Sequence, residues 1–167
     1  MIKQFIFYKS YMDNISNLTH TEAGQYLKKL LEFMFRDKEF DELATDKITS
    51  MLLLLSDDLK ADKERELADN HTPTSNERRF AFRSIYANIF FCLKDADAGI
   101  LIKQICDYMF GGSLVTAEET KSVKVIFRQS KYRFQKAKRN QKEQKRTIKS
   151  RQTSLLLLIK SVLIFRL

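Results

Sequence analysis

A run of positive charge near the C-terminal end is the feature of this sequence best suited to binding a ligand. Residues 131–151 hold ten Lys and Arg residues and one acidic residue, Glu143. The rest of the chain has 20 basic and 20 acidic side chains, so this segment alone accounts for the formal net charge of +9. Clustered cations suit phosphate contacts, and interleaved aromatic rings suit stacking on unpaired bases. The predicted nucleic-acid-binding residues are Lys131, Tyr132, Arg133, Phe134, Lys136, Lys138, Arg139, Lys142, Lys145, Arg146, Lys149 and Arg151.

The segment that follows is hydrophobic and leaves two uses open. Leu155–Leu167 spans 13 residues interrupted by Lys160 and Arg166, which is shorter than the roughly 20 apolar residues that cross a bilayer. A polybasic segment followed by a hydrophobic one is the order expected of an anchor on a membrane surface. The alternative is a last helix that packs on the body of the protein or covers a protein partner.

Side chains that commonly catalyse reactions or bind metals are few and widely spaced. The two histidines, His20 and His71, lack a second ligand at a metal-binding spacing, and no glycine-rich phosphate loop occurs. Cys92 and Cys106 lie on apolar stretches, which favours buried free thiols and a reduced, cytoplasmic setting. The sequence therefore predicts a protein that is not an enzyme, with no catalytic residue, no cofactor and no metal.

The chain repeats itself at an offset of 75 residues. Residues 5–35 align without a gap on residues 80–110. A match of this length predicts a tandem duplication, and the only proline, Pro73, marks the linker between the copies. The identical pairs include Phe5/Phe80, Phe7/Phe82, Tyr11/Tyr86, Leu18/Leu93, Ala23/Ala98, Gly24/Gly99, Lys28/Lys103, Met34/Met109 and Phe35/Phe110.

Each copy predicts three helices, because its apolar residues recur at intervals of three and four. Thr19 and Glu22 have the spacing of a capping box at a helix start. Gly111-Gly112 predicts the end of the second helix in the second copy. The third helix of the first copy is expected over residues 48–59.

Two further patterns bear on how the helices and chain ends are arranged. Gly24 and Gly99 interrupt strong helical patterns, which favours a close approach of two helices over a small Ala-Gly patch. Phe5 and Phe7 alternate with other residues, so a short strand at the start of each copy stays open.

The fold class predicted from these patterns is all-α: a tandem repeat of two three-helix units with a long basic C-terminal helix. No Gly or Pro follows residue 112, so a helix from Ala117 to Arg151 would extend for about 50 Å. The predicted divisions are a first helical repeat at 1–70, a linker at 71–79, a second helical repeat at 80–130, a basic helical extension at 131–151 and a hydrophobic segment at 152–167.

Motifs in both copies carry a family resemblance. The first copy reads F-x-F-Y-K-S-Y from Phe5 to Tyr11, followed by Leu18-Thr19 and Glu22-Ala23-Gly24, and the second ends in a Y-M-F-G-G sequence at residues 108–112. This pattern resembles a family of small phage and prophage domains of unknown function found in bacteria. The doubled domain and Arg36-Asp37 in place of an expected glycine depart from it. The resemblance implies a phage or mobile-element protein in the bacterial cytoplasm, and it brings no active site.

Together these features predict a non-enzymatic phage accessory protein that binds RNA, DNA or a nucleoprotein through residues 131–151. Such a protein could serve replication. By analogy with small, charged phage inhibitors that lack catalytic motifs, it could also inhibit a host RNA-guided defence effector of the CRISPR type, and so act on a host protein. The alternatives are a module that binds a membrane surface or a protein through residues 131–167, and a helical protein that self-associates as a homodimer through its acidic and basic ends.

Overall fold

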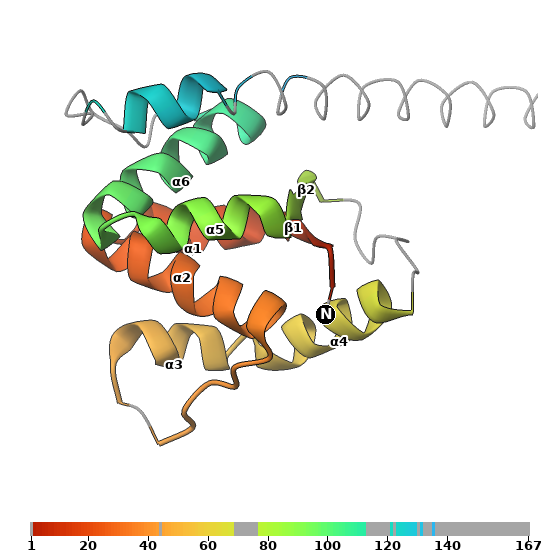
Figure 1. Cartoon of the computed structure of the whole chain (residues 1–167). Coiled ribbons are helices and arrows are strands. Elements are labelled where there is room, and N and C mark those ends of the chain that lie inside the picture. Colours follow the sequence, from red (N-terminus) through yellow and green to blue (C-terminus); the bar gives the residue numbers. More distant parts are fainter. Residues whose placement is uncertain are drawn as a thin grey trace, which may run out of the picture. The chain divides into compact units, whose positions relative to one another are not determined.

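The computed structural model describes residues 2–43, 45–68, 77–112, 121, 123–129, 131 and 135. The chain divides into two units, Met1–Ser130 and Lys131–Leu167, and the elements described here belong to the first. In chain order they are β1 (Gln4–Tyr8), α1 (Lys9–Ser16), α2 (His20–Arg36), α3 (Lys47–Leu53), α4 (Ser56–Leu67), β2 (Arg79–Arg83), α5 (Ser84–Cys92) and α6 (Asp95–Phe110) (Figure 1).

A short antiparallel sheet joins the starts of the two predicted repeats. β1 pairs with β2 so that Phe5 lies opposite Phe82 and Phe7 lies opposite Phe80. All four rings are buried, and the centroids of Phe7 and Phe80 are 5.0 Å apart. Alternate residues of a strand point to the same side, so the four rings share one face of the sheet. The all-α expectation is therefore corrected: the protein is mostly helical, with a small two-stranded sheet.

The predicted boundaries of two helices are confirmed. At the start of α2, the Glu22 backbone N–H donates to Thr19 Oγ1 over 3.2 Å, and the Thr19 backbone N–H donates to the Glu22 carboxylate over 2.8 Å. This is the predicted capping box. α6 ends before Gly111, whose φ of 78° favours glycine.

The capping box predicts an acid-dependent stability that Glu22→Gln should reduce. The hydrogen bond from the Thr19 backbone, with help from Lys47, lowers the pKa of Glu22 from 4.5 to about 2. A carboxylate with a lowered pKa stabilises the folded state above its ordinary pKa, and this contribution is lost as the pH falls towards 2. Urea unfolding of Glu22→Gln should therefore show a smaller loss of stability than the wild type between about pH 5 and pH 2.

Glu42→Gln is the matched control, because Glu42 is exposed and forms no ion pair with the described residues. It should keep the wild-type pH profile. Equal profiles for the wild type and Glu22→Gln would contradict the role given to the Glu22 carboxylate.

α2 and α6 pack against each other at the centre of the first unit (Figure 1). A Cβ added at Gly24 would overlap the backbone carbonyl oxygen of Asp95, and a Cβ added at Gly99 would overlap that of His20. The absence of a side chain at both positions therefore allows the helix backbones to approach. The close approach predicted from these glycines is confirmed.

Contacts between the halves recur with both partners shifted by 75 residues. The Lys28 ammonium donates to the carbonyl of Leu93 over 2.6 Å, and the Lys103 ammonium donates to the carbonyl of Leu18 over 2.5 Å. Each residue of one pair lies 75 positions from its counterpart in the other pair, and the halves exchange roles. This reciprocity is the relation expected of an approximate two-fold axis. The three-helix composition of each repeat is not confirmed, because each half begins with a strand.

The third helix expected in the first copy is divided into α3 and α4. The chain turns at Leu54 and Leu55, and Leu54 is 87% exposed. α4 is joined to α1 by the Tyr11 hydroxyl, which donates to the buried Asp62 carboxylate over 3.0 Å. Asp62 also pairs with Arg65 on α4. This division moves the exposed leucine out of the continuous helical stripe that the sequence predicts.

The predicted divisions of the chain fall only partly on described residues. The 1–70 segment contains β1 to α4, and the 80–130 segment contains α5, α6 and the helical residues 123–129. In the predicted 71–79 linker, residues 71–76 lie outside the described part, whereas Arg79 already belongs to β2. The 152–167 segment lies wholly outside it.

Candidate functional site

The predicted nucleic-acid-binding residues lie almost entirely beyond the described part of the chain. Lys131 is described, and it is helical and exposed. The geometry of binding by this segment stays a prediction. The eleven residues that lie outside the described part are Tyr132, Arg133, Phe134, Lys136, Lys138, Arg139, Lys142, Lys145, Arg146, Lys149 and Arg151.

Three further cations precede this segment on a described helical stretch. Lys121 and residues 123–129 are helical, and Lys121, Lys124 and Arg128 are exposed. Intervals of three and four residues place these cations on one face of the helix. The sequence prediction began the basic surface at Lys131 and missed them. The signal was present, because the same interval of three leads from Arg128 to Lys131.

The other side of this helix packs on the body of the first unit. Val123 is fully buried, and the ring of Phe127 meets the ring of Tyr108 on α6 with centroids 6.2 Å apart. Aromatic pairs at this separation and a large interplanar angle are favourable. The apolar contacts therefore orient the helix so that its cations face solvent.

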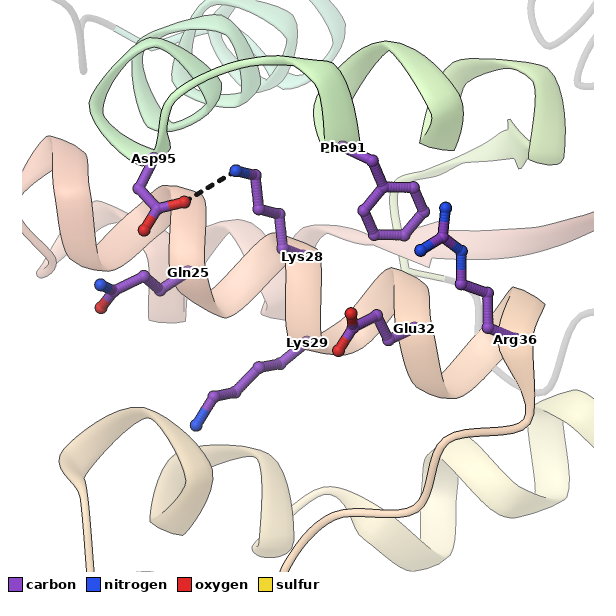
Figure 2. A pocket seen from close by; sticks show the side chains of 7 residues that line it. All are labelled: Gln25, Lys28, Lys29, Glu32, Arg36, Phe91 and Asp95. Carbon is purple, nitrogen blue, oxygen red and sulfur yellow. Dashed lines mark hydrogen bonds and ion pairs between the residues drawn. The ribbon is translucent and has the colours of Figure 1, made fainter.

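A second candidate site is a cavity of about 350 Å³ between α2 and α5, here called the α2–α5 cleft (Figure 2). Most of its lining comes from one side of α2, because residues three, four and seven apart share a helix face. α5 contributes an aromatic ring, and the first residue of α6 contributes a carboxylate. The lining residues are Gln25, Lys28, Lys29, Glu32, Arg36, Phe91 and Asp95.

Two lysines of the cleft are already neutralised by carboxylates. Lys28 Nζ lies 2.7 Å from Asp95 Oδ1, and this hydrogen bond holds the pKa of the Asp95 carboxyl below its usual range. Lys29 Nζ lies 3.2 Å from Asp46 Oδ2 at the start of α3. Hydrogen bonds from Thr49 lower the pKa of Asp46 to about 2, so both carboxylates carry charge at neutral pH.

The remaining charges at the other end of the cleft behave differently from each other. Glu32 pairs with Lys38 over 2.8 Å. The Arg36 guanidinium lies 3.7 Å from the centroid of the Phe91 ring, which is a cation–π contact between α2 and α5 (Figure 2). In the part of the chain that the structure describes, Arg36 forms no ion pair and no hydrogen bond.

The cleft belongs to one side of the approximate two-fold axis only. At the 75-residue offset, Arg36 corresponds to Gly111 and Phe91 corresponds to Ser16. The second half therefore has neither the guanidinium nor the ring, although it keeps a lysine, Lys103, in place of Lys28. Sequence reasoning missed the cleft, and the Gly111-for-Arg36 difference was the only trace of it in the repeat.

Other ionisable groups serve packing rather than catalysis. Burial raises the pKa of the Cys106 thiol, so it stays protonated and is a poor nucleophile. Burial also raises the pKa of Asp62, which accepts the Tyr11 hydrogen bond. No group of His, Cys, Asp and Glu residues within the described ranges could hold a metal ion.

The membrane-surface alternative receives no test from the described residues. None of their helices combines the length and the apolar character needed to cross a bilayer. The Leu155–Leu167 segment, on which that alternative depends, lies outside them.

Comparisons with known proteins return nothing similar to this chain. No family model matches it, and the searches of curated proteins and of solved structures find no match. The resemblance to small phage and prophage domains therefore remains a prediction based on the motifs alone.

Proposed function

We propose that this protein is a non-enzymatic accessory protein of a phage or mobile element that binds nucleic acid, or a nucleoprotein, through the basic segment 131–151. Inhibition of a guide-RNA-bound host defence effector falls within this proposal, because phosphate contacts do not distinguish free from protein-bound strands. The family resemblance supports the phage origin, and the charge of the segment supports the polyanionic partner.

The observation that carries the proposal is the exposed row of Lys121, Lys124 and Arg128. These residues lead into a segment with ten basic residues and one acidic residue. A helix that continues from residues 123–129 would extend the row, since Lys131, Lys138 and Lys145 recur at intervals of seven. Cations repeated along one helix face suit the regular phosphates of a nucleic-acid backbone.

The rest of the chain fits a separate, structural role. It contains 20 basic and 20 acidic residues, and its two halves contact each other reciprocally at the 75-residue offset. We infer that the body arose by duplication of one unit, with the basic segment prolonging the second copy. A neutral body of this kind is suited to holding the basic helix or to contacting a protein, and not to binding polyanions by charge.

The test compares the full chain with a variant in which all ten Lys and Arg residues of 131–151 are replaced by Gln. Binding to single-stranded RNA, duplex DNA and anionic lipid vesicles is measured over a salt series. The full chain should bind RNA or DNA, and the neutralised variant should lose this binding, because it lacks the cations that displace counterions from phosphate.

A second variant that ends at Ser154 separates the alternatives. It lacks the hydrophobic residues 155–167 and should keep nucleic-acid binding. Nucleic-acid binding that survives neutralisation of 131–151 would contradict the proposal. Vesicle binding that persists at high salt and needs residues 155–167 would instead favour the membrane-surface alternative.

A further inference from the structure

Arg36, the last residue of α2, has its guanidinium held in place but unused for hydrogen bonding. The group stacks on the Phe91 ring, the side chain is exposed, and it has no ion-pair partner among the described residues. Stacking restricts the guanidinium plane while the N–H donors at its edge remain available. Such an arrangement favours binding of a group that accepts two parallel hydrogen bonds.

The charge around the α2–α5 cleft leaves Arg36 as the uncompensated cation. The carboxylates nearest in the chain are engaged elsewhere: Glu32 with Lys38 at 2.8 Å and Asp37 with Lys63 at 2.8 Å. The two lysines that line the cleft are also paired, as described above. One positive charge therefore remains over, and it lies at the open end of a cavity of about 350 Å³.

The opposite end of the cleft offers neutralised polar groups. Lys28 uses two of its three donors, on Leu93 O and Asp95 Oδ1. The side chain of Gln25 lies beside Asp95 (Figure 2). These groups can donate to and accept from hydroxyls. Lys28 and Arg36 are separated by about 12 Å along α2, at 1.5 Å per residue, so a lone phosphate ion cannot engage both ends.

We propose that the α2–α5 cleft binds a sugar phosphate, with the phosphate oxygens on the Arg36 guanidinium and the sugar hydroxyls on Lys28, Gln25 and Asp95. The ligand is either a free sugar phosphate or the sugar-phosphate backbone of a nucleic-acid strand. The second source rests on the proposed function, whereas the first does not. The site exists on one side of the body only, because Gly111 and Ser16 replace the guanidinium and the ring on the other.

The experiment titrates the isotope-labelled full chain with ribose 5-phosphate, ribose, inorganic phosphate and a short single-stranded RNA, following the Arg36 Nε–Hε resonance. Ribose 5-phosphate should shift this resonance, and ribose alone should not. Calorimetry should show that Arg36→Gln weakens ribose 5-phosphate binding at least about tenfold. Arg36→Lys should also weaken binding, because an ammonium keeps the charge and loses the planar pair of donors.

Arg83→Gln is the matched control, since Arg83 is an exposed cation on β2 that does not line the cleft. It should bind ribose 5-phosphate like the wild type, and thermal unfolding should show that every variant is folded. An Arg36 resonance unmoved by both ribose 5-phosphate and RNA overturns the proposal. Inorganic phosphate that binds as tightly as ribose 5-phosphate overturns the hydroxyl contacts.

The RNA arm separates the two sources and the two proposals. A shift of Arg36 with RNA that persists when residues 131–151 are neutralised supports the cleft as a backbone site in its own right. Loss of RNA affinity on neutralisation with an Arg36 resonance still responsive to ribose 5-phosphate supports both proposals. Loss of RNA affinity with an unresponsive Arg36 supports the proposed function and overturns the cleft site.

Discussion

Gly24→Ala should destabilise the folded protein by about 3 kcal/mol or more, at the upper end of the range for overpacked cores. The added Cβ would overlap the backbone carbonyl oxygen of Asp95. A backbone atom cannot rotate away as a side chain can, so α2 and α6 must separate to accommodate the methyl group. Separation opens a gap between helices whose inward residues are fully buried and forfeits close packing contacts. Urea unfolding monitored by circular dichroism measures the loss.

Gly99→Ala should give a loss of similar size, because its Cβ would overlap the carbonyl oxygen of His20 in the reciprocal contact. Gly112→Ala is the control. A Cβ at Gly112 would meet only the side-chain ends of Asp107 and Met12, at 2.9 and 3.2 Å, and these ends can move. A loss below about 1 kcal/mol for Gly24→Ala, matching the control, would contradict the close helix approach.

The affinity of the full chain for duplex DNA should fall at least about 10³-fold between 50 and 200 mM salt, if six or more of the basic residues contact phosphate. Replacing Lys121, Lys124 and Arg128 together by Gln should lower the slope of log affinity against log salt by about three. The reason is that each contact releases about one counterion. Fluorescence anisotropy with a labelled duplex over the salt series measures both quantities.

A control variant removes three exposed cations elsewhere, with Lys3, Lys60 and Lys94 each replaced by Gln. It carries the same change in net charge and should leave the slope unchanged. Equal slopes for the two triple variants would mean that the row ahead of residue 131 takes no part in binding. A slope near zero for the wild type would remove phosphate contact from the proposed function altogether.

Much of the fold was predictable from local signals. The capping box at Thr19 and Glu22 depends on four consecutive residues, so it could be identified from spacing alone. The glycines at 24 and 99 indicated close helix packing because each is unfavourable inside a helix unless space is short. The repeat itself was visible because 75 residues separate both the sequence matches and the reciprocal contacts.

The sheet and the divided third helix were harder to predict. Phe5 and Phe7 alternate as strand residues do, but five residues give too short a pattern to outweigh the surrounding helical signal. Their strand is stabilised by pairing with β2, which lies far along the chain. The run of leucines at 52–55 fits one continuous helix, and only the exposure of Leu54 shows that the chain turns there.

The α2–α5 cleft could not be predicted, because its decisive pair lies 55 residues apart in the sequence. Arg36 and Phe91 meet only through the packing of α2 and α5. An isolated arginine at a helix end indicates favourable interaction with the helix dipole and nothing more specific. The basic segment, by contrast, was evident from charge counting, which needs no fold.

The pairing of β1 with β2 has a consequence for synthesis on the ribosome. β1 emerges first, but its partner strand is translated about 70 residues later. Until then the Phe5 and Phe7 rings lack the rings that bury them, and the strand edge lacks its hydrogen bonds. The first half is therefore a nascent chain that must wait for the second, and folding of the body is completed as one long-range step after α6 has left the exit tunnel.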